Sequence, residues 1–249
     1  MYTNEYGSRE DPTIILLAPM MVSGENLYEI MSPHFKRQYH FIFPDQGGHG
    51  KAGAYISADD KYAQLKKALV KSGHRDIFLV YVASMGSAIG YRLFMDKEFE
   101  VKHAWFDGVV LTEKAAFAEW LMKTMFHRQR RKLLKSHIDA SPSIVKMYGH
   151  DFARMMTHNL ERITEADIDH ICYACCHYRL RLLSNEEQRK LHLDFGEKDP
   201  DLRYAKKSIP KYMPSVKPTI RKGYTHCAYM AAHPAEYVQE IESFIAELS

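Results

Sequence analysis

The 249-residue sequence has few cysteines, little excess charge and no long apolar run. Four cysteines cannot build a disulfide framework for a chain of this length, so we expect reduced thiols, as in a cytoplasmic protein. No apolar run approaches the ~18–20 residues that cross a bilayer, and the polar first residues do not resemble a secretory signal. A formal net charge of +3 is too small to indicate nucleic-acid binding. The composition predicts a cytoplasmic globular protein with no stable membrane insertion.

Short apolar runs alternate with amphipathic segments over the first 113 residues, which is typical of βαβ units with a parallel sheet. We expect helices over Gly24–Phe35, Ser57–Ser72 and Ser84–Met95. The predicted strands of this half are Thr13–Ala18, Tyr39–Phe43, Ile77–Val82 and Ala104–Leu111.

Helical patterns alone follow until about Lys190, among them Asp151–Glu161 and Thr164–Leu183. Strand patterns then return at Leu191–Phe195 and Val216–Arg221, and Pro234 begins a last helix. The predicted class is therefore α/β: a mostly parallel sheet of about six strands, flanked by helices, in a core of residues 1–113 and 190–249. Residues 114–189 would form an inserted helical cap.

Ser84 stands between the third predicted strand and the helix after it, in Val82-Ala83-Ser84-Met85-Gly86. Parallel sheets bind ligands beyond the carboxyl ends of their strands. A sharp turn there would expose the hydroxyl above the sheet, as a nucleophile requires. The alternative interpretation is that Ser84 only caps the helix, because serine is a favoured N-cap.

The order of motifs resembles that of the α/β-hydrolase superfamily. Asp45, Gly48 and Gly50 match its D-x-x-G-x-G loop after the second predicted strand. Ser84 comes next, then a helical segment, then Asp199 after the fifth predicted strand and His226 after the sixth. The resemblance implies a serine hydrolase with a helical cap and with Ser84 as nucleophile, His226 as base and Asp199 as orienting acid. Glu197, Asp201 and Glu113 remain rival acids, and His49 and His233 rival histidines.

Two features of the expected site depart from the superfamily pattern. Val82 replaces the first glycine of G-x-S-x-G, and its branched side chain would crowd the following helix. The resemblance implies an oxyanion hole formed by two backbone N–H groups, of Met85 and of a residue after the first predicted strand. Pro19 has no N–H, so Met20 is the expected donor there and Met21 the reserve.

The cap would supply an apolar substrate pocket, for which Met21, Trp120, Met125 and Met155 are the candidates. The basic run His127–Lys132 with Lys135 indicates a solvated helix face or an anion site. Cys172, Cys175 and Cys176 share a helix face and read as core rather than as metal ligands. The run Gly48–Gly53 matches G-x-G-x-x-G, but the next helix begins too late for a dinucleotide site.

We therefore expect cleavage of a carboxylic ester or thioester of a small to medium, partly apolar substrate, without cofactor or metal. The alternatives are a non-catalytic protein of the same fold that binds a small apolar ligand, and an acyltransferase with the same triad. The expected partner is a small-molecule ester, with no nucleic acid. A homodimer is left open.

Overall fold

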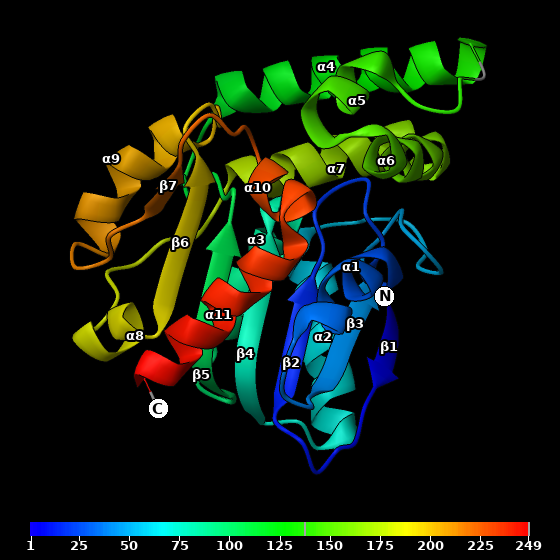
Figure 1. The fold of residues 1–249 in the computed structure, drawn as a ribbon. Helices are drawn as coiled ribbons and strands as arrows, with labels where there is room; N and C mark the ends of the chain where they lie inside the picture. Colours follow the sequence, from blue (N-terminus) through cyan, green and yellow to red (C-terminus); the bar gives the residue numbers. More distant parts are fainter. Residues whose placement is uncertain (137, 249) are drawn as a thin grey trace.

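The computed structural model describes residues 1–136 and 138–248. A seven-stranded sheet crosses its centre in the order β1-β3-β2-β4-β5-β6-β7 (Figure 1). β1 is antiparallel to β3, and the other neighbouring strands are parallel. The strands are β1 (Tyr2–Tyr6), β2 (Thr13–Leu17), β3 (His40–Asp45), β4 (Asp76–Ala83), β5 (Glu100–Asp107), β6 (Leu191–Gly196) and β7 (Thr219–Arg221). The predicted α/β class is confirmed, with one strand more than the six expected.

The strand that the sequence did not reveal is β1. Its residues, YTNEY, are exposed or half-buried at the edge of the sheet. An edge strand with no buried face lacks the apolar pattern by which strands are recognised. β5 lies four residues earlier than the predicted strand Ala104–Leu111. The apolar run continues to Leu111, whereas the strand ends at Asp107.

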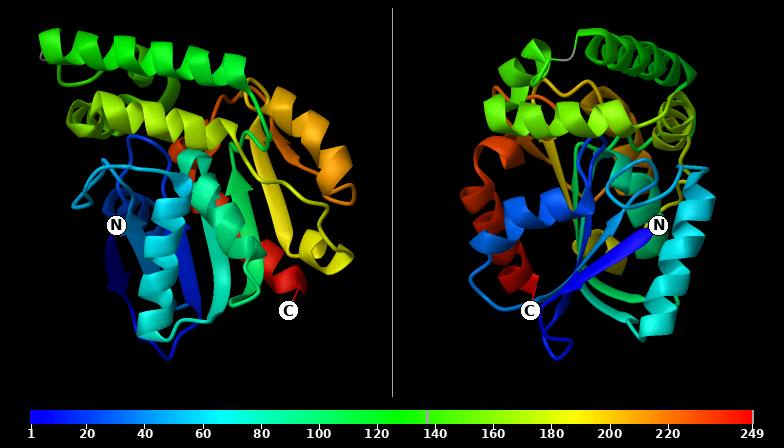
Figure 2. Two further views of the ribbon diagram at one scale, coloured as in Figure 1. Left: turned by 180° about the vertical axis from the view of Figure 1, so that it is seen from behind. Right: turned by 90° about the vertical axis from the view of Figure 1, so that its right-hand side faces the viewer.

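Helices cover both faces of the sheet (Figures 1 and 2). α1 (Gly24–Met31) and α11 (Pro234–Leu248) lie on one face, and α2 (Ala58–Ser72) and α3 (Ser87–Met95) on the other. Successive residues of a strand point to opposite faces, so Ile14 and Leu16 join one core cluster whereas Ile15 and Leu17 join the other. Burial on both faces explains why β2 reads as a continuous apolar run.

A layer of helices lies over the carboxyl-terminal edge of the sheet (Figure 1). It consists of α4 (Ala116–Ser136), α5 (Pro142–Tyr148), α6 (His150–Arg162) and α7 (Glu165–Cys176). Thr164 caps α7, with Asp167 completing a capping box. α7 ends at Cys176 and not at Leu183 as predicted. No helix in the described ranges is long and apolar enough to cross a membrane.

Shorter elements complete the fold. Ser57 caps α2 and Gly73 ends it in a left-handed conformation. The remaining elements are η1 (Ser32–His34), η2 (Ser84–Gly86), α8 (Asn185–Arg189), α9 (Leu202–Tyr212) and α10 (Ala228–Ala232).

Candidate active site

Ser84 stands in a tight turn between β4 and α3. Its φ of +44° lies in the left-handed region, which non-glycine residues rarely adopt. Gly86 allows the turn to lie close to β2, because a Cβ there would come within 2.4 Å of the Leu17 carbonyl oxygen. Strain of this kind is concentrated at functional sites, and here it places the serine at the carboxyl end of β4.

Val82, which departs from the superfamily pattern, is accommodated by a glycine on the next helix. A Cβ on Gly90 of α3 would lie 2.4 Å from Val82 Cγ2. The absence of a side chain at Gly90 therefore leaves room for the branched side chain at Val82. The crowding of the helix by Val82, which we expected from the sequence, is therefore avoided because residue 90 is a glycine.

His226 follows β7 and points at Ser84. Its Nε2 lies 2.7 Å from Ser84 Oγ, and its Nδ1 lies 3.0 Å from Asp199 Oδ2. A carboxylate accepts only, so we assign the proton to Nδ1, and Nε2 accepts from the Ser84 hydroxyl. Tyr148 of α5 donates to the His226 carbonyl oxygen at 2.9 Å. The fold thus brings together the three residues that the resemblance nominated.

Two carboxylates, not one, face the imidazole. Asp201 Oδ2 lies 3.5 Å from His226 Nδ1, and the Asp201 N–H donates to Asp199 Oδ1 at 2.9 Å. Burial, and secondarily the charge of Asp199, raise the pKa of Asp201 to about 6, although His226 draws it down. Burial alone would lower the pKa of His226, but the adjacent Asp199 carboxylate raises it well above its ordinary value.

Three of the rival residues weighed from the sequence have partners away from the His226 imidazole. Glu197 accepts from the Gly223 N–H, and Glu113 pairs with Lys211 and Tyr212. His233 bonds to the Tyr224 hydroxyl at 2.6 Å. Asp201 is the one rival that the fold places beside the imidazole.

The loop after β2 supplies the second backbone N–H of the candidate oxyanion hole. Among the described residues, the Met20 N–H donates a hydrogen bond to no acceptor. The Met21 N–H is already engaged, because it donates to His49 Nε2 at 2.9 Å. Met85 is in the first turn of η2, where N–H groups have no partner within the helix. Met20 and Met85 therefore remain the candidate donors, and the reserve, Met21, is unsuited.

Three side chains hold this loop in place. His49 Nδ1 lies 3.0 Å from the Gly47 carbonyl oxygen, which leaves Nε2 as an acceptor for Met21. Asn159 of α6 donates to the Met21 carbonyl oxygen at 3.0 Å, and Gln46 donates to that of Ala18 at 2.8 Å. Met21 has a φ of +68°, so the loop needs such support. From the sequence we considered His49 only as a rival base, because nothing in it indicates a bond to Met21.

An apolar cavity of about 230 Å³ opens over Ser84, between the end of the sheet and the helical layer α4–α7. Met21 and Met125 line it, as expected. Trp120 and Met155 do not: the Trp120 side chain packs beside Phe117 and is 59% exposed. Residues of the helical layer that the sequence did not indicate for the lining include Ile144, Tyr148 and Ile171. Phe126 lines the cavity as well, and Met156 lines it in place of its neighbour Met155. The pocket prediction was thus wrong at Trp120 and Met155.

The other motifs of the sequence contribute no residue to the triad, although Cys175 lines the cavity and His49 supports the loop after β2. Cys172, Cys175 and Cys176 are buried, and burial raises the pKa of the Cys172 and Cys176 thiols to about 12. Part of the basic run is engaged within the helical layer, since His127 pairs with Asp169 and Arg130 donates to the Ile163 carbonyl oxygen. α2 begins only at Ala58, so no helix starts within the G-x-G-x-x-G match.

Comparison with known proteins establishes the fold. No family profile matches the chain, and no curated protein matches its sequence. A carboxylesterase structure from Nitrososphaera gargenis is 14% identical with a TM-score of 0.76, covering 99% of this chain and 94% of its own. An esterase from Exiguobacterium antarcticum is 12% identical with a TM-score of 0.75, covering 98% and 95%.

A structure with a different named activity matches equally well. A bromoperoxidase from Bacillus anthracis is 15% identical with a TM-score of 0.74, covering 98% of this chain and 94% of its own. The chain therefore has the fold of the α/β-hydrolase superfamily. One fold supports several chemistries, so the activity has to be argued from the site.

Proposed function

We propose that this protein is a serine hydrolase that cleaves carboxylic esters or thioesters through an acyl-enzyme on Ser84. The observation that carries the proposal is the chain of contacts from Ser84 Oγ to His226 Nε2, at 2.7 Å, and from His226 Nδ1 to Asp199 Oδ2, at 3.0 Å. A serine hydroxyl is a weak nucleophile until a neighbouring base removes its proton. His226 is within reach to do so, and Asp199 stabilises the imidazolium that forms.

The reaction would run in two halves. Ser84 Oγ attacks the substrate carbonyl carbon while His226 takes the hydroxyl proton, and the N–H groups of Met20 and Met85 receive the oxyanion. The tetrahedral intermediate collapses, and His226 gives its proton to the departing alcohol or thiol. Water, deprotonated by His226, then attacks the acyl-enzyme. His226 gives that proton to Ser84 Oγ as the carboxylic acid leaves, which restores the hydroxyl and the neutral imidazole.

The cavity supports a small to medium, partly apolar acyl or alkyl group. Its lining is dominated by methionine and aliphatic side chains from the cap, such as Met122, Met156 and Ile171. Methionine adapts to ligands of different shape. The neighbouring structures named as an esterase and a carboxylesterase support the same class of substrate.

A panel of p-nitrophenyl esters and acyl thioesters of graded chain length tests the proposal. We expect turnover of the shorter members, abolished in Ser84→Ala and unchanged in Ser243→Ala, a control on an exposed serine of α11. If the folded protein turns over no member but one of them still raises its melting temperature, the fold serves as a binding protein. If turnover appears only when an alcohol or amine acceptor is added, the protein is an acyltransferase.

A further inference from the structure

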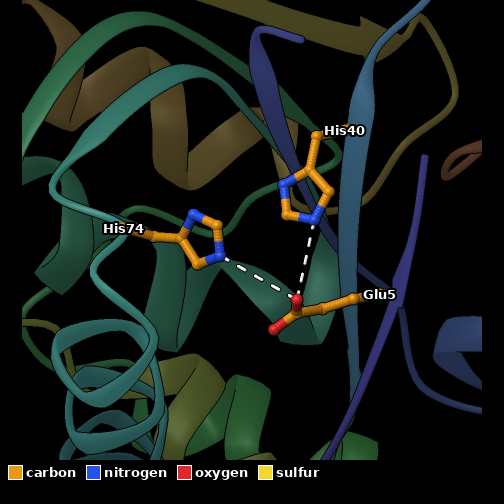
Figure 3. A group of neighbouring side chains, drawn as sticks. All are labelled: Glu5, His40 and His74. Carbon is orange, nitrogen blue, oxygen red and sulfur yellow. Dashed lines mark ion pairs between the residues drawn. The ribbon is translucent and has the colours of Figure 1, made fainter. Parts of the chain in front are cut away.

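A second cluster of chemically reactive side chains lies on the other side of the fold from Ser84. Glu5 of β1, His40 at the start of β3 and His74 in the turn after α2 converge there (Figure 3). His40 begins a strand whose carboxyl end faces the candidate active site, so the cluster is at the opposite, amino-terminal edge of the parallel strands. The mechanism proposed above uses none of these residues.

The three side chains point their ligand atoms at a common centre. His40 Nε2 lies 3.6 Å and His74 Nε2 3.9 Å from the same oxygen of Glu5, Oε2. All three atoms lie within 4.8 Å of one another (Figure 3). Both separations from Glu5 are too long for a direct hydrogen bond. They are close to the ~3.4 Å that tetrahedral geometry with zinc–nitrogen and zinc–oxygen bonds of about 2.0–2.2 Å would give.

The burial of the two imidazoles needs an explanation. The side chains of His40 and His74 are only 1% and 10% exposed, and their rings stack at 4.9 Å. His74 Nε2 is buried and has no hydrogen-bond partner in the described part of the chain. A buried polar atom without a partner costs about 1–3 kcal/mol. A metal ion bound by both nitrogens would remove that cost.

We propose that Glu5, His40 and His74 form a binding site for a divalent transition-metal ion, with Zn²⁺ as the expected ion. Two histidines and one carboxylate are a ligand set that zinc uses, with the fourth position left to another ligand. The Thr13 hydroxyl lies 3.3 Å from His40 Nδ1 and would orient that ring from the far side.

A metal ion would have to compete with a positively charged side chain for the Glu5 carboxylate. Arg9, whose side chain is 59% exposed, lies 2.7 Å from Glu5 Oε2 and competes for that oxygen. A metal ion would displace Arg9 into solvent or onto the other oxygen of Glu5. Because the ligands come from β1, β3 and the α2–β4 turn, the bound ion would attach the edge strand to the rest of the sheet. The role expected is therefore structural.

Zinc titration of the chelator-treated full chain, followed by calorimetry, tests the site. We expect one equivalent to bind and to raise the melting temperature, with tenfold or greater loss of affinity in Glu5→Gln and in His74→Gln. His150→Gln changes an exposed histidine of α6 in the same way and should bind as the unchanged protein does. Far-ultraviolet circular dichroism checks that each variant is folded.

Cobalt supplies a second readout that depends on coordination. One equivalent of Co²⁺ should give the visible absorption of a four-coordinate ion in the unchanged protein and in His150→Gln, and lose it in the two cluster variants. The proposal is overturned if no metal binds, or if Glu5→Gln and His74→Gln bind zinc as tightly as the unchanged protein. Reactivity of Ser84 is a separate measurement, so failure here leaves the proposed hydrolase function standing.

Discussion

Gly90 lies directly against Val82, such that a Cβ on Gly90 would come within 2.4 Å of Val82 Cγ2. The two residues are complementary in size: Val82 on β4 has a branched side chain, and Gly90 on α3 has none. We predict that Gly90→Ala destabilises the protein by about 1–2 kcal/mol, because overpacking outweighs the ~1 kcal/mol that alanine gains in a helix. Chemical denaturation measures this change.

The double variant Val82→Ala/Gly90→Ala is the matched control. Removing the two methyl groups of Val82 makes room for the new Cβ, so the double variant should lose clearly less stability than the sum of the losses in Val82→Ala and Gly90→Ala. Additive losses in the two single changes would contradict the pairing.

A second prediction concerns the support of the oxyanion loop. His49→Ala removes the acceptor of the Met21 N–H, and with it a constraint on the neighbouring Met20 N–H. We expect kcat for ester hydrolysis to fall at least tenfold, toward the ~10²–10³-fold loss known for removal of an oxyanion donor, with little change in KM. His158→Ala, an exposed histidine of α6, should leave both constants unchanged. A loss confined to KM would show that His49 acts on substrate binding instead.

The two carboxylates beside His226 should differ in importance. Asp199 is closer to Nδ1, at 3.0 Å against 3.5 Å for Asp201. Asp199→Asn should reduce kcat by about 10⁴-fold, because the imidazole loses its orienting partner. Asp201→Asn should reduce it far less. Steady-state kinetics on one ester decides between them, and equal losses would mean that the pair acts as a unit.

The same pair predicts the dependence of activity on pH. His226 must be neutral to act as a base, and the Asp199 carboxylate holds its pKa well above the ordinary value in spite of burial. Activity should therefore rise with pH, and the rise should come at a higher pH than the ordinary pKa of histidine would give. A carboxylate stabilises the imidazolium, so Asp201→Asn should lower the pKa of His226 and move the rise in kcat/KM to lower pH. A rise that stays in place would show that Asp201 is not coupled to the base.

A further prediction concerns the cavity. Phe126 of α4 is half-buried and lines it, whereas Phe117 of the same helix is 65% exposed and does not. Phe126→Ala should enlarge the cavity and shift kcat/KM toward longer acyl chains by about fivefold or more, in keeping with ~1–3 kcal/mol per methylene group in an apolar pocket. Phe117→Ala should leave the preference unchanged. The graded ester panel measures both.

The elements that the sequence predicted correctly are those in which burial or a helix cap produces a recognisable residue pattern. β2 and β4 read as apolar runs because helices cover both faces, and Ser57 and Gly73 bound α2 through local hydrogen bonds and backbone geometry. Ser84, Asp199 and His226 could be nominated because each follows a strand at the edge where parallel sheets bind ligands. β1 was missed because an exposed edge strand carries no such pattern.

What depended on contacts between distant residues could not be predicted. Met155 and Met156 are neighbours on α6, and only the rotation of that helix against the core decides which one lines the cavity. The bond from Met21 to His49 and the space that Gly90 leaves for Val82 arise when separate elements pack together. The second carboxylate, Asp201, was weighed as a rival to Asp199, whereas the fold places both beside His226.

Reaction with a fluorophosphonate, followed by mass spectrometry of the intact protein and its peptides, tests most directly whether Ser84 is an activated nucleophile. The account predicts one adduct per chain, on the peptide that contains Ser84, and slower labelling in His226→Ala. A folded protein that gains no adduct, or gains it on a different serine, would contradict it.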